Sequence, residues 1–89
     1  MSAKGITLTF HTDPGHGWLE IEKQLVIELG IAPKISRFSY VLGTRMFLEE
    51  DCDAGLAIDA LKARGYEVGF KEVVHTNNQH WIRNLNRFE

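Results

Sequence analysis

The sequence predicts one small α+β domain, in which an antiparallel sheet of four to six strands carries two helices. Apolar and polar residues alternate in several short segments, a pattern typical of strands with one buried face. Two other segments are predicted to be helices, from the spacing of their apolar residues or from residues that are typical of helix ends. The 89 residues suit a single domain, so we expect one unit over residues 1–89 with the element order ββα–ββα–β(β).

The first predicted hairpin covers residues 5–23. Residues 6–10 alternate Ile, Leu and Phe with threonine, and residues 18–23 alternate again. The sequence DPGHG at residues 13–17 separates the two runs. Proline fixes φ, aspartate bonds to its own backbone and glycine accepts positive φ, so this segment predicts a turn.

A short helix is predicted for residues 24–29. Gly30 suits the position just after a helix, and Pro33 prevents its continuation. A continued strand is the alternative, because Val26 and Ile27 are β-branched.

Residues 35–42 and 45–49 alternate again and predict a second hairpin, with the sequence LGT as its turn. We expect Met46 and Leu48 on one face of this hairpin and Phe47 on the other, because successive strand residues point to opposite faces.

The second predicted helix follows this hairpin and ends at Gly65. Asp51 or Asp53 is suited to cap its N-terminus, where carboxylates also favour the positive end of the helix dipole. Basic residues in its last turn favour the negative end. Its buried face has the spacing i, i+3, i+4, i+7 and comprises Ala54, Ala57, Ile58 and Leu61.

The C-terminal third predicts further strands. Residues 66–71 alternate, and residues 73–75 either continue that strand or begin a new one after a bend. The polar residues 76–79 predict a turn, after which residues 80–83 are expected to pair back.

Charge and cysteine content narrow the function classes. The formal net charge of −2, from 10 basic and 12 acidic residues, is unlike that of a dedicated nucleic-acid-binding protein. The single cysteine, Cys52, excludes an intramolecular disulfide and fits a reducing compartment. Neither a signal peptide nor a membrane span is indicated, so we expect a cytoplasmic protein.

All four histidines lie at two turns with similar sequences. In each turn a His-Thr pair is followed five positions later by a second histidine near a tryptophan. Such residues can present two imidazoles to one side of a hairpin. Both pairs together, or one pair with Asp13 or Glu49, could bind zinc or another transition metal, and a histidine beside a carboxylate could act as a general acid or base. The alternative is a set of ordinary polar turn residues. The histidines are His11, His16, His75 and His80.

Acidic residues flank Cys52 between the second hairpin and the second helix. Their carboxylates could cap the helix, hold a hard cation such as Mg²⁺ or Ca²⁺, or face a partner. We expect Cys52 to be a buried structural thiol. With two residues of the first turn, these carboxylates form the expected partner-binding surface, which comprises Asp13, His16, Glu49, Glu50, Asp51 and Asp53.

Three segments carry a resemblance to a known group of proteins. The sequences HTDPGHGWLEI, FLEEDCDAGL and HWIRNLNRF resemble small proteins carried by bacteriophages and other mobile elements, which share a DPGHGW turn, an LEEDCDA segment and a closing IRNL-x-RF. The resemblance spans most of the chain and implies no catalytic residues. It implies a bacterial host cell as the setting, and the binding and blocking of a host protein, including CRISPR and other defence components, as the kind of action.

The leading hypothesis is therefore a non-enzymatic accessory protein that binds a host protein stoichiometrically, as a monomer or homodimer and without a cofactor. A small metal-assisted hydrolase that uses the histidine turns is the first alternative. A nucleic-acid-binding accessory protein is the second, and its basic and aromatic surface would comprise Arg37, Arg45, Trp81, Arg83 and Arg87.

Overall fold

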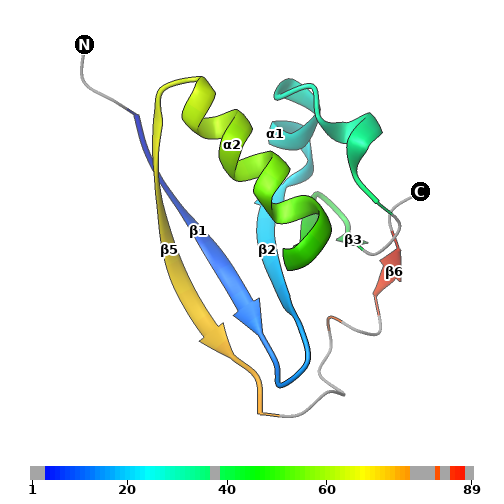
Figure 1. Ribbon diagram of the computed structural model, residues 1–89. Helices are drawn as coiled ribbons and strands as arrows, with labels where there is room; N and C mark the ends of the chain where they lie inside the picture. Colours follow the sequence, from blue (N-terminus) through cyan, green and yellow to red (C-terminus); the bar gives the residue numbers. More distant parts are fainter. Residues whose placement is uncertain (1–3, 37–38, 77–81, 83–84, 88–89) are drawn as a thin grey trace.

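The computed structural model of the chain describes residues 4–36, 39–76, 82 and 85–87. Figure 1 shows a twisted sheet with helices α1 and α2 packed on one of its faces. A 3-10 turn covers Ala32–Lys34, and a π-helical turn, η2, covers Glu50–Ala54. The helices and strands in chain order are β1 (Lys4–Thr12), β2 (Gly17–Glu22), α1 (Lys23–Glu28), β3 (Tyr40–Leu42), β4 (Arg45–Glu49), α2 (Gly55–Ala63), β5 (Tyr66–Val74) and β6 (Asn86–Arg87).

The α+β class, the first hairpin and both helices are confirmed. The second hairpin is confirmed with a shorter first strand, which covers Tyr40–Leu42 and not residues 35–42. β1 and β2 pair across the turn at residues 13–16, and β3 pairs with β4 across Gly43, which has a φ of 58°. Both helices are followed by a glycine with positive φ, Gly30 after α1 and Gly65 after α2. This left-handed backbone is the usual end of a helix and favours glycine, so the sequence signal was specific.

The prediction of a wholly antiparallel sheet is wrong in one pairing. The described strands lie in the order β5-β1-β2-β4-β3-β6. β1 is antiparallel to β2 but parallel to β5, from Lys4 opposite Tyr66 to Thr12 opposite Val74. The sheet is mixed because α2 carries the chain back to the end at which β4 began, and β5 then runs in the same direction as β4 and β1.

The C-terminal part of the sheet also differs from the expectation. Residues 66–74 form one continuous strand, so no bend divides it. The strand expected at residues 80–83 lies outside the described residues except for Ile82, which is fully buried. A two-residue strand, β6, pairs antiparallel with β3 further along the chain.

The main core lies between the sheet and the two helices. Leu19, Ile21, Met46 and Leu48 are fully buried there, against Leu61 of α2. We call this side of the sheet the helix face. A smaller apolar cluster lies on the opposite face and comprises Trp18, Tyr40, Phe47 and Ile82, with Leu85 beside it. The alternation predicted for the β2 and β4 segments therefore places each apolar residue on the expected face.

The residue that caps the helical segment before α2 differs from the predicted one. Neither Asp51 nor Asp53 caps the helical segment; the Glu49 side chain accepts hydrogen bonds from the backbone N–H groups of Asp51 and Cys52 instead. These bonds satisfy donors at the first turn, where a negative charge also faces the positive end of the helix dipole. Among the described residues, no helix has the length and apolar character that a membrane span requires.

Candidate functional site

The structure separates the histidines of the first turn into two different environments. His11 belongs to β1 and is buried on the opposite face of the sheet, with 6% of its surface exposed. His16 lies in the turn itself, and its side chain is 49% exposed. Because the two side chains do not converge, the expected four-histidine metal site is not formed by the described histidines His11, His16 and His75. His80 lies outside the described residues.

His11 lies at the centre of a chain of polar contacts that we call the histidine network. His11 Nε2 lies 2.8 Å from Glu20 Oε1, and His11 Nδ1 lies 3.2 Å from His75 Nε2. The other Glu20 oxygen lies 3.3 Å from Arg45 Nε, and Arg45 also contacts Glu22 at 2.9 Å. The network crosses four strands or strand ends of the sheet, from β4 through β2 and β1 to the residue just beyond β5.

The roles of donor and acceptor follow for a neutral His11 beside an ionised Glu20. An ionised carboxylate only accepts, so the His11 nitrogen that faces Glu20 carries the proton. His11 Nδ1 is then an acceptor, and His75 Nε2 donates to it. The backbone N–H of His75 also donates to the carbonyl of Thr12 at 2.6 Å. The network therefore fastens the end of β5 to β1, which is a structural role.

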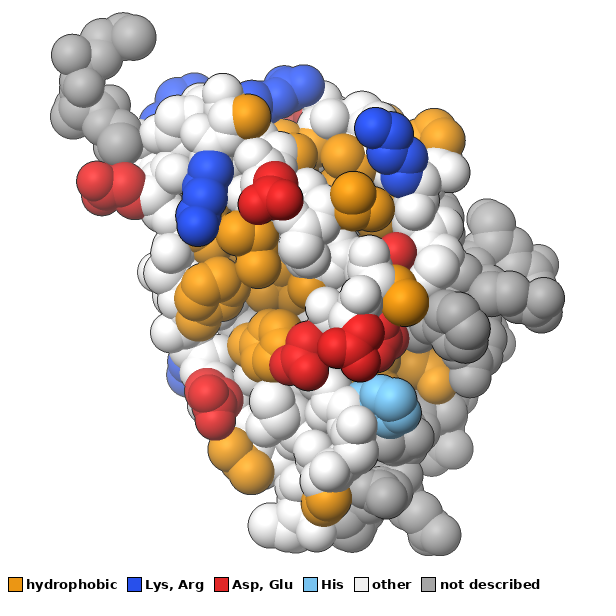
Figure 2. Space-filling view, viewed as in Figure 1, with side chains coloured by type: hydrophobic (Ala, Val, Ile, Leu, Met, Phe, Trp, Pro, Cys, Tyr) orange, Lys and Arg blue, Asp and Glu red, His pale blue; other side chains and the backbone are white. Residues whose placement is uncertain are grey.

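The exposed histidine lies in the second environment, beside the acidic residues. His16 Nδ1 lies 3.5 Å from Glu49 Oε1, and ligand atoms of His16, Glu49 and Asp51 all lie within 4.8 Å of one another. Figure 2 shows a histidine directly beside a row of acidic side chains near the start of α2. Two segments that are distant in sequence therefore meet at one surface.

The geometry of the turn holds His16 in this position. Asp13 Oδ1 accepts hydrogen bonds from the backbone N–H groups of Gly15 at 2.8 Å and His16 at 2.7 Å, as the sequence predicted for an aspartate in a turn. Gly17 allows Glu50 to approach the turn closely. A Cβ at Gly17 would lie 2.8 Å from the Phe10 ring and 2.9 Å from Glu50 Oε2, so a larger residue would push the two segments apart.

Asp53 does not belong to this surface. Its side chain is buried, with 1% of the residue exposed, and its carboxylate accepts hydrogen bonds from the backbone N–H and the hydroxyl of Ser36 and from the hydroxyl of Ser39. Ser39 Oγ in turn accepts from the backbone N–H of Glu49 at 2.9 Å. Asp53 therefore anchors the segment that precedes β3, and we remove it from the expected partner-binding residues.

The expectation of a buried Cys52 is also wrong, because this thiol is exposed at the same surface. Partial desolvation raises its pKa, as do a hydrogen bond with Glu49 and the negative charges of Glu49, Asp53 and Asp51. A raised pKa disfavours the nucleophilic thiolate, so Cys52 is not suited to nucleophilic catalysis at neutral pH.

What remains is a group of residues that we call the acidic surface: the exposed His16, Glu50 and Asp51 and the half-buried Asp13, with the buried Glu49 beneath them. One Glu49 oxygen is occupied by the backbone, and the other faces His16. An imidazole nitrogen and carboxylate oxygens are ligands that Zn²⁺ accepts, and ligand atoms spaced by a few ångströms suit one ion.

The basic and aromatic surface proposed for nucleic acid is largely outside the described part of the chain. Arg37, Trp81 and Arg83 are not described, and the Arg87 side chain is likewise not described. Arg45 is described, and its guanidinium contacts two glutamates of β2.

Comparison with family models, with curated proteins and with solved structures finds no match to this chain.

Proposed function

We propose that this protein is a non-enzymatic binding protein that engages a host protein stoichiometrically through the acidic surface. The observation that carries the proposal is the meeting of the 13–17 turn with the start of η2. That meeting gathers the exposed side chains of His16, Glu50 and Asp51 over a rigidly held Glu49. A surface held in place before binding loses less conformational entropy when a partner docks on it.

Charge indicates the kind of partner. Within the described residues, neither Glu50 nor Asp51 takes part in an ion pair, and both are exposed. Their carboxylates are therefore available to lysine or arginine side chains of a partner, which would steer association and fix its orientation. The partner surface we propose is basic, with an acceptor or carboxylate placed to meet His16.

The setting of this binding is supported by the resemblance of the DPGHGW and LEEDCDA segments to small proteins of bacteriophages and mobile elements. These two segments contribute most of the acidic surface. We propose a bacterial cytoplasm as the location and a host defence component, such as a CRISPR effector, as the class of target. Blocking such a target needs one bound copy per target and no catalytic group.

The test compares two charge-reversed variants. The variant Glu50→Lys/Asp51→Lys reverses the acidic surface. The matched control, Glu28→Lys/Asp59→Lys, makes the same change of charge at exposed residues of α1 and α2. Tagged proteins are expressed in a bacterial host, and captured proteins are identified by mass spectrometry. We expect one host protein to be captured by the wild type and the control and lost with E50K/D51K. Equal capture by both variants would show that the acidic surface does not bind the host protein.

A second candidate function rests on the same residues. His16, Glu49 and Asp51 offer three ligand atoms in one small volume, which favours a metal-assisted hydrolase at this position over one built on all four histidines. Elemental analysis of untagged protein, with zinc titration of wild type, His16→Ala and Asp51→Asn, tests this candidate. Stoichiometric zinc that is lost in both variants would support it, and equal binding by all three proteins would exclude this site.

A further inference from the structure

β5 is an edge strand whose outer side is open in the described structure. It lies at one end of the strand order, and Figure 1 shows it at the margin of the sheet beside β1. It is nine residues long, and two of its apolar side chains are strongly exposed, Phe70 at 51% and Val74 at 65%. A long edge strand with exposed apolar residues is a template for pairing with another strand.

The backbone groups available for such pairing follow from the register with β1. The Gly65 carbonyl accepts from the N–H of Lys4, and the N–H of His75 donates to Thr12. Backbone polar groups of successive strand residues point alternately to the two sides, so the odd-numbered residues of β5 face β1. The even-numbered residues, including Val68 and Phe70, direct their N–H and C=O groups to the open edge.

We propose that a second copy of this chain pairs with that edge, β5 antiparallel to β5, with the two-fold axis at Gly69. In this register Glu67 lies opposite Lys71 of the second copy, and Lys71 lies opposite its Glu67. Each copy thus contributes one carboxylate and one ammonium to two reciprocal ion pairs. Directly opposite residues of an antiparallel pair share a face, so both ion pairs lie on the face opposite the helices.

The same register also suits the apolar side chains on the helix face and the backbone hydrogen bonds between the two strands. Val68 lies opposite Phe70 of the second copy, and these two residues exchange backbone hydrogen bonds because both are directed to the open edge. Phe70 borders a hollow of about 290 Å³ that is also lined by Phe10, Ile58 and Glu72. A valine from the second copy would cover this apolar region, which accounts for the exposure of Phe70 in a single chain.

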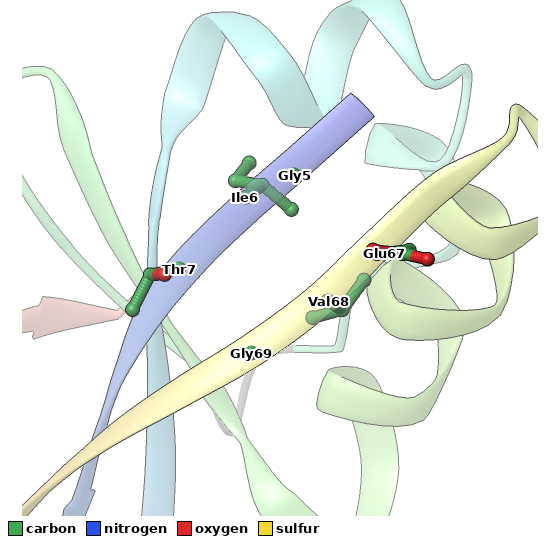
Figure 3. Close-up of a pocket in the computed structure, with 6 residues that line it drawn as sticks. All are labelled: Gly5, Ile6, Thr7, Glu67, Val68 and Gly69. Carbon is green, nitrogen blue, oxygen red and sulfur yellow. The ribbon is translucent and has the colours of Figure 1, made fainter. Parts of the chain in front are cut away.

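The two-fold registers centred on the next two residues do not match the charges. An axis at Phe70 places Lys71 opposite a glycine and Glu67 opposite Val73, and an axis at Lys71 places two lysines opposite each other. Gly69 also suits the axis sterically, because no side chain projects from β5 there (Figure 3). The shallow depression shown in that view, about 390 Å³ in volume, lies over Gly5, Ile6, Thr7, Glu67, Val68 and Gly69.

A cysteine cross-link tests the register directly. In a Cys52→Ser background, Gly69→Cys places two thiols at a non-hydrogen-bonded pair on the axis, where Cα atoms lie about 4.5 Å apart and a disulfide can form. The new side chain has room, since a Cβ at Gly69 meets Thr7 only at 3.7 Å. We expect covalent dimer under mild oxidation, and at least about tenfold slower cross-linking for Phe70→Cys, whose thiols are diagonal neighbours. Faster cross-linking of F70C would overturn the register.

Charge reversal tests the ion pairs in solution. Glu67→Lys or Lys71→Glu alone turns both attractive pairs into repulsive ones, so we expect each to weaken the dimer about tenfold or more in sedimentation equilibrium. The double variant E67K/K71E restores opposite charges and is expected to restore the wild-type dissociation constant. A wild type that stays monomeric at millimolar concentration, or a double variant as weak as the singles, would overturn the proposal. We expect E50K/D51K to leave dimerisation unchanged, because residues 50 and 51 lie outside β5, so this test is independent of the proposed host partner.

Discussion

His11 and His16 lie five residues apart in one hairpin, yet they belong to regions of opposite character. His11 is buried, and its two ring nitrogens contact Glu20 and His75. His16 is half exposed, and it shares a small volume with carboxylates that have no lysine or arginine partner among the described residues. Satisfied buried polar groups stabilise a fold, whereas exposed groups with unused bonding capacity are available to a ligand or partner. We therefore assign a structural role to the histidine network and propose a binding role for the acidic surface.

The largest effect expected on stability comes from Asp53, the buried acidic residue next to the acidic surface in sequence. Asp53→Ala would leave the hydroxyls of Ser36 and Ser39 and the backbone N–H of Ser36 without their acceptor. We expect the free energy of unfolding to fall by about 3 kcal/mol, since several buried hydrogen bonds to a charged group are lost together. Urea denaturation followed by circular dichroism measures this fall. A loss below about 1 kcal/mol would contradict the role of Asp53 as an anchor.

The second largest loss of stability is expected from a substitution in the histidine network. The comparison of His11 with His16 tests whether their two environments differ. His11→Ala leaves the Glu20 carboxylate without its imidazole and removes ring contacts with His75 and with Phe47, whose centroid lies 5.7 Å away. We expect a loss of about 2 kcal/mol of unfolding free energy for this variant. His16→Ala is the matched control, with an expected change within about 0.5 kcal/mol. Equal losses would mean that the two environments do not differ as described.

The smallest effect concerns the Cys52 thiol. It is a change in the rate of alkylation and not in the free energy of unfolding. Because its pKa is raised, a smaller fraction of Cys52 is thiolate at pH 8 than for an unperturbed thiol. Alkylation by iodoacetamide is therefore expected to be slower than for a cysteine in a short peptide, and to accelerate as pH rises toward the raised pKa. Glu49→Gln removes one cause of the shift, so alkylation at pH 8 should become faster. A faster rate in wild type than in the peptide would contradict the environment described.

The strands and helices were predictable because their signals are local. Period-two alternation placed Trp18 and Phe47 on the face opposite the helices, and positive-φ glycines marked the ends of α1 and α2. The parallel pairing of β5 with β1 was not predictable in this way. It depends on where α2 carries the chain across the sheet, and no local pattern records that path.

The candidate site was predictable in composition but not in geometry. The turn and the acidic segment were both identified, yet their meeting depends on β2 pairing with β4, which places Trp18 opposite Glu49. The capping role moved from Asp51 or Asp53 to Glu49, because several carboxylates of similar chemistry lie within five residues. The pairing of His11 with His75 spans 64 residues of sequence, so it too required the fold.

The most direct measurement of the central claim is site-specific photo-crosslinking in a bacterial host. A photoreactive amino acid replaces His16 in one protein and Asp59, an exposed residue of α2, in a matched control. If the acidic surface binds a host protein, illumination yields one defined cross-linked host protein from position 16, absent from position 59 and suppressed by E50K/D51K in the same chain. No product from position 16, or the same products from both positions, would contradict the account.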